Sequence, residues 1–196
     1  MNPLARARVV TLPAMAPRVR LTAPKPEDRR EFIDLVEASV ELHRPWTYPP
    51  ADAASYRRLL ERNRSDNFYA LLARRTEDDA IVGLFEFSDV IRGAFQNAYL
   101  GYWVGGPYAG QGYMTEGMQL ALRFAFNELR LHRVEANIQP ANKRSLALAK
   151  RAGFRREGFS PRYLKIGGRW RDHERWAILS DDRARLGHKA RRFTGR

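Results

Sequence analysis

The sequence predicts a single α/β domain in which a mixed central sheet is flanked by helices. Three observations support this prediction. Strand and helix patterns alternate from residue 18 onward, two strands run directly into helix starts, and the last part of the chain reads as a β-hairpin. The length of 196 residues and the hydrophobic content of 44% suit one domain with one core.

The first half of the chain predicts a strand, two helices and two more strands. Apolar residues such as Phe32, Leu35, Val36 and Val40 recur at three- and four-residue spacing, which is typical of a helix with one buried face. Prolines bracket the loop between the two helices. The expected ranges are 18–22 for the first strand, 27–42 and 53–63 for the helices, and 68–73 and 80–87 for the later strands.

The middle of the chain predicts an anion-binding turn. Residues 99–117 read YLGYWVGGPYAGQGYMTEG, an apolar strand that enters a glycine turn and then a helix. Gly110 and Gly112 leave the backbone bare, so N–H groups from Gly110 to Thr115 are expected to converge on a phosphate, helped by the helix dipole. The P-loop and dinucleotide signatures are not matched, since Thr115 replaces the third glycine of the latter.

A second strand-to-helix unit follows over residues 133–152. Asn142 is a natural N-cap for the helix over 142–152, and Ser145 falls at the third helical position on the same end. Gly153 suits the helix end. Taken alone this pattern is compatible with a capped helix and nothing more, but beside the glycine turn it favours a binding site.

The third unit is a β-hairpin near the carboxyl end. Its strands are expected over residues 163–166 and 169–178, and the Gly167-Gly168 pair between them suits a primed turn.

These motifs resemble those of the GNAT N-acetyltransferases. Residues 109–114 lie on the R/Q-x-x-G-x-G/A pattern of the family's pyrophosphate loop, from which Ala109 and Met114 depart. The most similar branch is the RimJ/RimL ribosomal-protein N-acetyltransferases, and among them the RimJ alanine type. The resemblance lies in residues 81–93, 99–116, 142–145 and 163–173.

The resemblance implies a GNAT-type domain in which a splayed strand pair forms an acetyl-CoA cleft. It further implies transfer of an acetyl group from acetyl-CoA, as cosubstrate, to a protein N-terminal α-amine, with alanine of a ribosomal protein as the expected acceptor. The transfer would be direct, and the lack of cysteine excludes a covalent acetyl intermediate on sulfur.

The resemblance also assigns roles to residues. Backbone groups of residues 102–104 are expected to pair with the pantetheine arm and to polarise the thioester carbonyl. Ser145 is expected to protonate the departing thiolate, because Ala149 occupies the position of the tyrosine that many relatives use. Candidates for the 3′-phosphate, chosen from proximity alone, are Lys143, Arg144 and Lys150. The expected cofactor-binding residues are Tyr102, Trp103, Val104, Gly110, Gln111, Gly112, Tyr113, Met114, Thr115 and Asn142.

The general base is left among several acidic or imidazole side chains. Glu86, which alternates with two phenylalanines on an expected strand, is the first candidate, and an ordinary solvent-facing strand residue is its equal alternative. Asp172 and His173 come next. Glu135 lies two residues before Asn137, where some relatives carry a glutamate.

The composition limits which chemical groups the protein can use and in which cellular compartment it is expected. Without cysteine there is no disulfide or thiolate site, which suits a reducing cytoplasm. The four histidines show no ligand spacing, so no metal is expected. No apolar run approaches the ~18 residues of a membrane span, so no membrane partner is expected.

The chain is strongly basic, with 35 Lys and Arg against 22 Asp and Glu. Part of the excess lies in an expected flexible lead, residues 1–17, and in a tail, residues 183–196, around a domain over 18–182. Coenzyme A phosphates, ribosomal RNA or a ribosomal particle would suit this charge, the last two through the basic ends.

Three alternatives stay open at this point. One is an acetyltransferase of a small amine such as an aminoglycoside or a polyamine. Another is a non-catalytic ribosome-binding or RNA-binding module, whose binding would be salt-sensitive and indifferent to Ser145. The third is a structural α/β protein, which leaves the converging backbone donors without a purpose.

Overall fold

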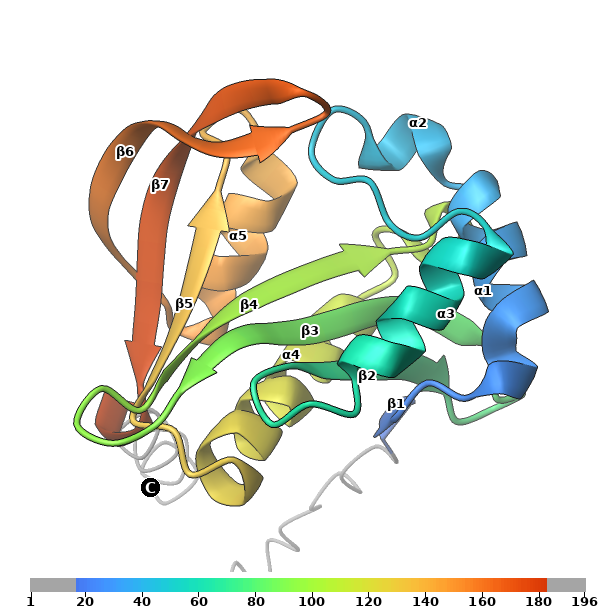
Figure 1. The fold of residues 1–196 in the computed structure, drawn as a ribbon, viewed down its shortest axis with the longest axis horizontal. Helices are drawn as coiled ribbons and strands as arrows, with labels where there is room; N and C mark the ends of the chain where they lie inside the picture. Colours follow the sequence, from blue (N-terminus) through green and yellow to red (C-terminus); the bar gives the residue numbers. More distant parts are fainter. Residues whose placement is uncertain (1–16, 183–196) are drawn as a thin grey trace, which may run out of the picture.

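The computed structural model of the chain describes residues 17–182 (Figure 1). The sequence-predicted lead and tail, residues 1–17 and 183–196, lie outside the described residues apart from Pro17. A seven-stranded mixed sheet runs in the order β1-β2-β3-β4-β5-β7-β6. Its strands are β1 (Val19–Thr22), β2 (Tyr69–Arg75), β3 (Ile81–Ile91), β4 (Asn97–Val104), β5 (Arg133–Ile138), β6 (Arg155–Ile166) and β7 (Arg169–Leu179).

Helices cover both faces of this sheet (Figure 1). Side chains of α1 and α3 form one buried cluster with β2, β3 and β4, while α4 and α5 form a larger cluster on the opposite face. The expected α/β class, with a mixed sheet and a carboxyl-terminal hairpin, is therefore confirmed. The helices are η1 (Pro26–Asp28), α1 (Arg29–Glu37), α2 (Val40–His43), α3 (Ala53–Arg62), η2 (Gly106–Tyr108), α4 (Tyr113–Arg123), η3 (Phe124–Glu128) and α5 (Lys143–Ala152).

Two expected elements differ from the structure. The single helix expected over residues 27–42 is broken at Ser39, whose hydroxyl donates to the Leu35 carbonyl (2.5 Å) and accepts from the Gly106 N–H (2.8 Å). This side chain competes with the helix's own hydrogen bonds. The first hairpin strand starts at Arg155 and so is longer than predicted. It lies at the sheet edge with most of its side chains exposed, and so lacks the apolar alternation that marks a half-buried strand.

The feature that creates the site is the parting of β4 and β5. These parallel strands pair only between Asn97 and Arg133 and on to Tyr99 and Glu135, and they diverge beyond that point. The Gly105 N–H donates to the Val82 carbonyl, on the β3 side. Because backbone groups alternate in direction along a strand, those of Tyr102 and Val104 face the gap that β5 leaves.

Within residues 17–182, no helix is both long enough and apolar enough to cross a membrane.

Candidate active site

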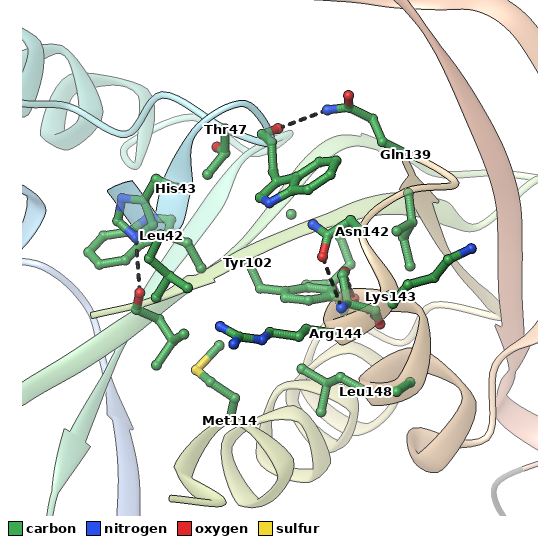
Figure 2. Close-up of a pocket in the computed structure, with 18 of the residues that line it drawn as sticks. Leu42, His43, Thr47, Tyr102, Met114, Gln139, Asn142, Lys143, Arg144 and Leu148 are labelled. Carbon is green, nitrogen blue, oxygen red and sulfur yellow. Dashed lines mark hydrogen bonds between the residues drawn. The ribbon is translucent and has the colours of Figure 1, made fainter. Parts of the chain in front are cut away.

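A cavity of about 1410 Å³ occupies the opening between β4 and β5 (Figure 2). It is lined from four sides: the starts of α4 and α5, the segment around α2, the centre of the sheet, and the β6–β7 hairpin. The lining does not include two of the sequence-predicted site residues, Gln111 and Tyr113. It does include the others, which are Tyr102, Trp103, Val104, Gly110, Gly112, Met114, Thr115, Asn142, Ser145 and Glu86.

The glycine turn has the conformation that its sequence predicts. Gly110 and Gly112 have φ values of 79° and 87°, in the left-handed region that favours glycine. A Cβ atom on Gly112 would also lie 3.0 Å from the Arg18 guanidinium. One expectation is corrected: the Thr115 N–H donates to the Gly112 carbonyl (3.0 Å) and is not free for an anion. The free donors therefore end at Met114, and Thr115 contributes through its place in the cavity lining.

The side chains of Gln111 and Tyr113 turn away from the cavity and brace the turn. The Gln111 amide donates to the Pro107 carbonyl (2.6 Å), and the Tyr113 ring packs against Tyr108 and beneath Arg18. Arg18 in turn forms an ion pair with Glu116 in the first turn of α4. Only the backbone of Gln111 and Tyr113 can therefore serve a ligand in the cavity.

At the start of α5 a serine and a tyrosine form one polar pair. The Asn142 side chain accepts from the Ser145 N–H (3.1 Å), which fixes the first turn as the N-cap prediction requires (Figure 2). The Ser145 and Tyr102 hydroxyls lie 2.7 Å apart. Burial raises the pKa of Tyr102 to about 12, so its phenol keeps its proton at neutral pH. When the phenol donates to Ser145, the serine hydrogen is free to point into the cavity.

His43 is a site residue that no motif in the sequence indicates. Its Nε2 donates to the Val104 carbonyl (2.9 Å), so one of the gap-facing backbone groups is already engaged (Figure 2). Burial lowers the pKa of His43, which keeps the ring neutral at neutral pH. The Trp103 indole packs edge-on against Phe32 and His43. By the alternation along β4, the backbone of Trp103 faces β3, so Tyr102 and Val104 are the two residues of 102–104 that offer groups to the gap.

Glu86 lies on the face of the sheet that carries α1 and α3, directly opposite Gly101 on β4. A Cβ atom on Gly101 would lie 3.1 Å from the Glu86 carboxylate, so the glycine makes room for this side chain. Among residues 17–182 the carboxylate has no hydrogen-bond donor and no ion-pair partner. Burial raises the pKa of Glu86, and the positive charge of Arg62 partly opposes that rise. Glu86 is thus a half-buried acid facing the cavity, and the solvent-facing alternative is wrong.

The other base candidates are placed less favourably. Asp172 is exposed and accepts from the Arg162 N–H (2.7 Å), outside the cavity lining. Glu135 is held by Arg133 at 2.8 Å. His173 does line the cavity, and burial lowers its pKa, but one ring nitrogen is engaged with the Arg171 carbonyl.

A loop after α2 lines the cavity through Trp46 and Thr47. Gln139, at the end of β5, donates to the Trp46 carbonyl (3.3 Å) (Figure 2). Tyr48 packs against the hairpin turn, because a Cβ atom on Gly167 would lie 2.4 Å from its hydroxyl. The loop therefore joins the amino-terminal helices to the β6–β7 hairpin above the gap.

Cationic side chains lie at the α5 end of the cavity. Lys143, Arg144 and Arg151 line it, whereas Lys150, which was also expected to meet a phosphate, does not. Residues 17–182 contain no group of three or more His, Asp or Glu side chains that could hold a metal ion.

Comparison with known proteins matches this architecture. Residues 18–155 match the profile of the acetyltransferase (GNAT) domain family. A [ribosomal protein uS5]-alanine N-acetyltransferase from Escherichia coli is 32% identical over 181 residues, which cover 85% of this chain and 93% of that protein.

Two solved structures extend the comparison. RimJ from Mycobacterium smegmatis in complex with CoA-disulfide superimposes with a TM-score of 0.77 at 28% identity, covering 84% of this chain and 83% of that one. A spermidine N-acetyltransferase from Vibrio cholerae gives a TM-score of 0.69 at 19% identity over 85% of this chain and 96% of its own, a similarity of fold alone.

The free N–H groups of residues 110–114 at the glycine turn form what we call the anion cradle. Replacement of Gly112 by alanine tests it. The new Cβ would strain a left-handed backbone by about 1–2 kcal/mol and press on Arg18, so we expect the dissociation constant for coenzyme A to rise about tenfold. Titration calorimetry measures this constant. The matched control is Gly93→Ala, which has the same backbone strain (φ 71°) at a position with open space around it. Equal coenzyme A affinities for the two variants would contradict the cradle.

Proposed function

This chain belongs to the GNAT family and is an N-acetyltransferase, and we propose that it transfers the acetyl group of acetyl-CoA to the α-amine of a protein N-terminus. We further propose that the acceptor is alanine at the N-terminus of a ribosomal protein. The similarity to the alanine N-acetyltransferase over 85% of the chain supports this choice. The observation that carries the proposal is the gap between β4 and β5, which has an anion cradle at one end and an unpaired carboxylate on its floor.

The residues present fit acetyl-CoA. The bare glycine turn offers N–H groups of residues 110–114 to the pyrophosphate, and the α4 dipole adds positive potential. Free backbone groups of Tyr102 and the Val104 N–H offer hydrogen bonds to the amides of the pantetheine arm. Lys143, Arg144 and Arg151 line the cavity and are the cations that we propose for the remaining phosphate.

The reaction that we propose is a direct transfer. The neutral α-amine attacks the thioester carbon, a C–N bond forms, the C–S bond breaks, and the amine loses one proton while the departing sulfur gains one. A gap-facing backbone N–H of β4 polarises the carbonyl. Glu86 receives the amine proton, directly or through water, and Ser145 supplies a hydrogen bond and a proton to the sulfur. Glu86 then returns its proton to water and Ser145 takes one from water, so both groups regain their starting states. Tyr102 holds the serine oxygen in place for that step.

A peptide panel tests the function. We expect thiol release from acetyl-CoA to be fastest with N-terminal Ala, compared with Ser, Thr and Met in otherwise identical peptides. Free coenzyme A is measured with a thiol reagent, which the cysteine-free protein does not consume. Turnover of spermidine or an aminoglycoside with no turnover of any peptide would move the assignment to a small-amine acetyltransferase. Coenzyme A binding without turnover of any acceptor would favour a non-catalytic module.

The Tyr102 and Ser145 pair predicts non-additive kinetics. We expect Ser145→Ala to lower kcat about a hundredfold, because the sulfur loses its proton donor, and Tyr102→Phe to lower it about tenfold with an unchanged KM. The double variant should be no slower than Ser145→Ala, since the tyrosine acts through the serine. A tenfold effect of Tyr102→Phe that persisted in the Ser145→Ala background would show that the tyrosine acts on its own.

Glu86→Gln is expected to lower activity and raise stability. Because burial raises the pKa of Glu86 in the folded protein, ionisation of this carboxyl group opposes folding. The contribution of Glu86 to the free energy of unfolding is therefore highest at low pH and falls as the pH rises through the raised pKa. The amide variant should therefore unfold at higher denaturant than the native protein at pH 7, with the difference vanishing near pH 4. Its pH–rate profile should retain only the rise in rate that accompanies deprotonation of the acceptor amine, near pH 8.

The matched control for this variant is Glu135→Gln, which breaks the ion pair with Arg133 on the same face of the sheet. It should not gain stability at pH 7. Native-like activity of Glu86→Gln across the pH range would exclude the carboxylate as the base.

A further inference from the structure

The acceptor side of the cavity is bordered by a row of arginines on β7. Arg169, Arg171, His173 and Arg175 alternate along this strand and therefore share one face, at intervals of about 7 Å. His173 itself lines the cavity.

The pairing of the sheet sets each arginine opposite a residue that lines the cavity. Arg169 lies opposite Ile166, and Arg171 lies opposite Leu164, both of which line the cavity from β6. On the other side of β7, Arg175 lies opposite Asn137, a cavity-lining residue of β5. Directly opposed residues project to the same face of a sheet, so Arg169 and Arg171 lie beside cavity-lining residues. Arg175 starts from the same face, but its guanidinium extends over Gly158 of β6, and none of the three arginines is itself in the cavity lining.

These three charges have no partner in the part of the chain that the structure describes. None of them has a carboxylate within 4.0 Å, in contrast to Arg133, which is bonded to Glu135 and Glu157. The charge of Arg175 does help to lower the pKa of Glu157, after the larger effect of Arg133. Arg169 and Arg175 are exposed, and the buried Nε of Arg171 has no hydrogen-bond acceptor. The Arg175 guanidinium lies over Gly158 of β6, where a Cβ atom would come within 2.8 Å of it, so the absence of a side chain there makes room for it.

The site is therefore divided by charge. Its floor carries the unpaired carboxylate of Glu86, and the one other carboxylate in its lining is that of Glu41, on α2. On the face of β7 shared by Arg169, Arg171, His173 and Arg175 the strand's charged side chains are the three arginines, while Asp172 and Glu174 alternate to the opposite face. An acceptor that matches this arrangement has an amine at its tip and negative charge further along its length.

We propose that Arg169, Arg171 and Arg175 form a docking strip for acidic side chains that follow the acetylated residue of the acceptor. This inference rests on the proposed function and specifies its substrate class: N-terminal segments with Asp or Glu a few residues after the amine. The same strip disfavours a polyamine, whose charges are positive along its whole length.

Paired peptides test the docking strip. Two Ala-initiated peptides of equal length carry either Glu or Lys at positions four to seven, and kcat/KM is measured for each. Two or three exposed charge pairs predict a preference of about three- to tenfold for the acidic peptide. The preference should shrink between 50 mM and 500 mM salt because the charges are exposed.

Charge reversal supplies the decisive variant. Arg169→Glu with Arg175→Glu should invert the preference and leave the KM for acetyl-CoA unchanged. Neither side chain is buried, so the fold should be retained. The matched control, Arg29→Glu with Arg123→Glu, makes the same change in net charge at exposed positions on α1 and α4 that do not line the cavity. It should keep the native preference.

The outcomes separate this inference from the proposed function. Equal turnover of both peptides by the native protein, or equal effects of the two double variants, would overturn the docking strip and leave N-terminal acetylation standing. A loss of binding to single-stranded RNA on charge reversal, with the peptide preference unchanged, would overturn it in favour of an RNA surface. No turnover of either peptide, with turnover of small amines, would overturn both.

Discussion

The parting of β4 and β5 is the constraint on which the rest of the structure depends. Paired from Asn97 to Tyr99 and no further, these strands leave backbone groups of the central sheet without partners. Such groups are costly when buried, so they must meet water or a ligand. The starts of α4 and α5 lie at this opening because each helix connects to one of the diverging strands. One irregularity in the sheet thus supplies free backbone donors, two helix amino termini and the space between them.

The two groups proposed for proton transfer lie on different faces of the sheet at this opening. Alternation along β4 sends the Tyr102 side chain toward α5, where it meets Ser145, and leaves Gly101 on the opposite face beneath Glu86. The group proposed to serve the leaving sulfur and the group proposed to serve the incoming amine therefore lie on opposite sides of one strand. A thioester placed along that strand would be approached by the amine from one face while its sulfur is stabilised from the other.

Local motifs could be predicted from the sequence, whereas contacts between distant segments could not. Glycines at 110 and 112 and the Asn142 cap act on their own backbone, so their sequence signals sufficed. Within the glycine turn the extent of the free donors was wrong, because Thr115 bonds within its own turn. The Tyr102 and Ser145 contact spans 43 residues and the His43 and Val104 contact spans 61. Such pairs depend on which face of the sheet a side chain occupies and on which helix covers it.

The unpaired state of Glu86 is a cost that its proposed role explains. A carboxylate in a partly dry cavity without a donor destabilises the fold, and nothing among its described neighbours compensates for it fully. A terminal ammonium has a pKa of about 7.7–8, well above that of an ordinary carboxyl group. Burial of Glu86 narrows this difference, so transfer of the amine proton to the carboxylate becomes less unfavourable than it would be in water. The same desolvation that weakens the fold thereby prepares the amine for attack, which is the trade-off expected where a side chain is kept for its chemistry.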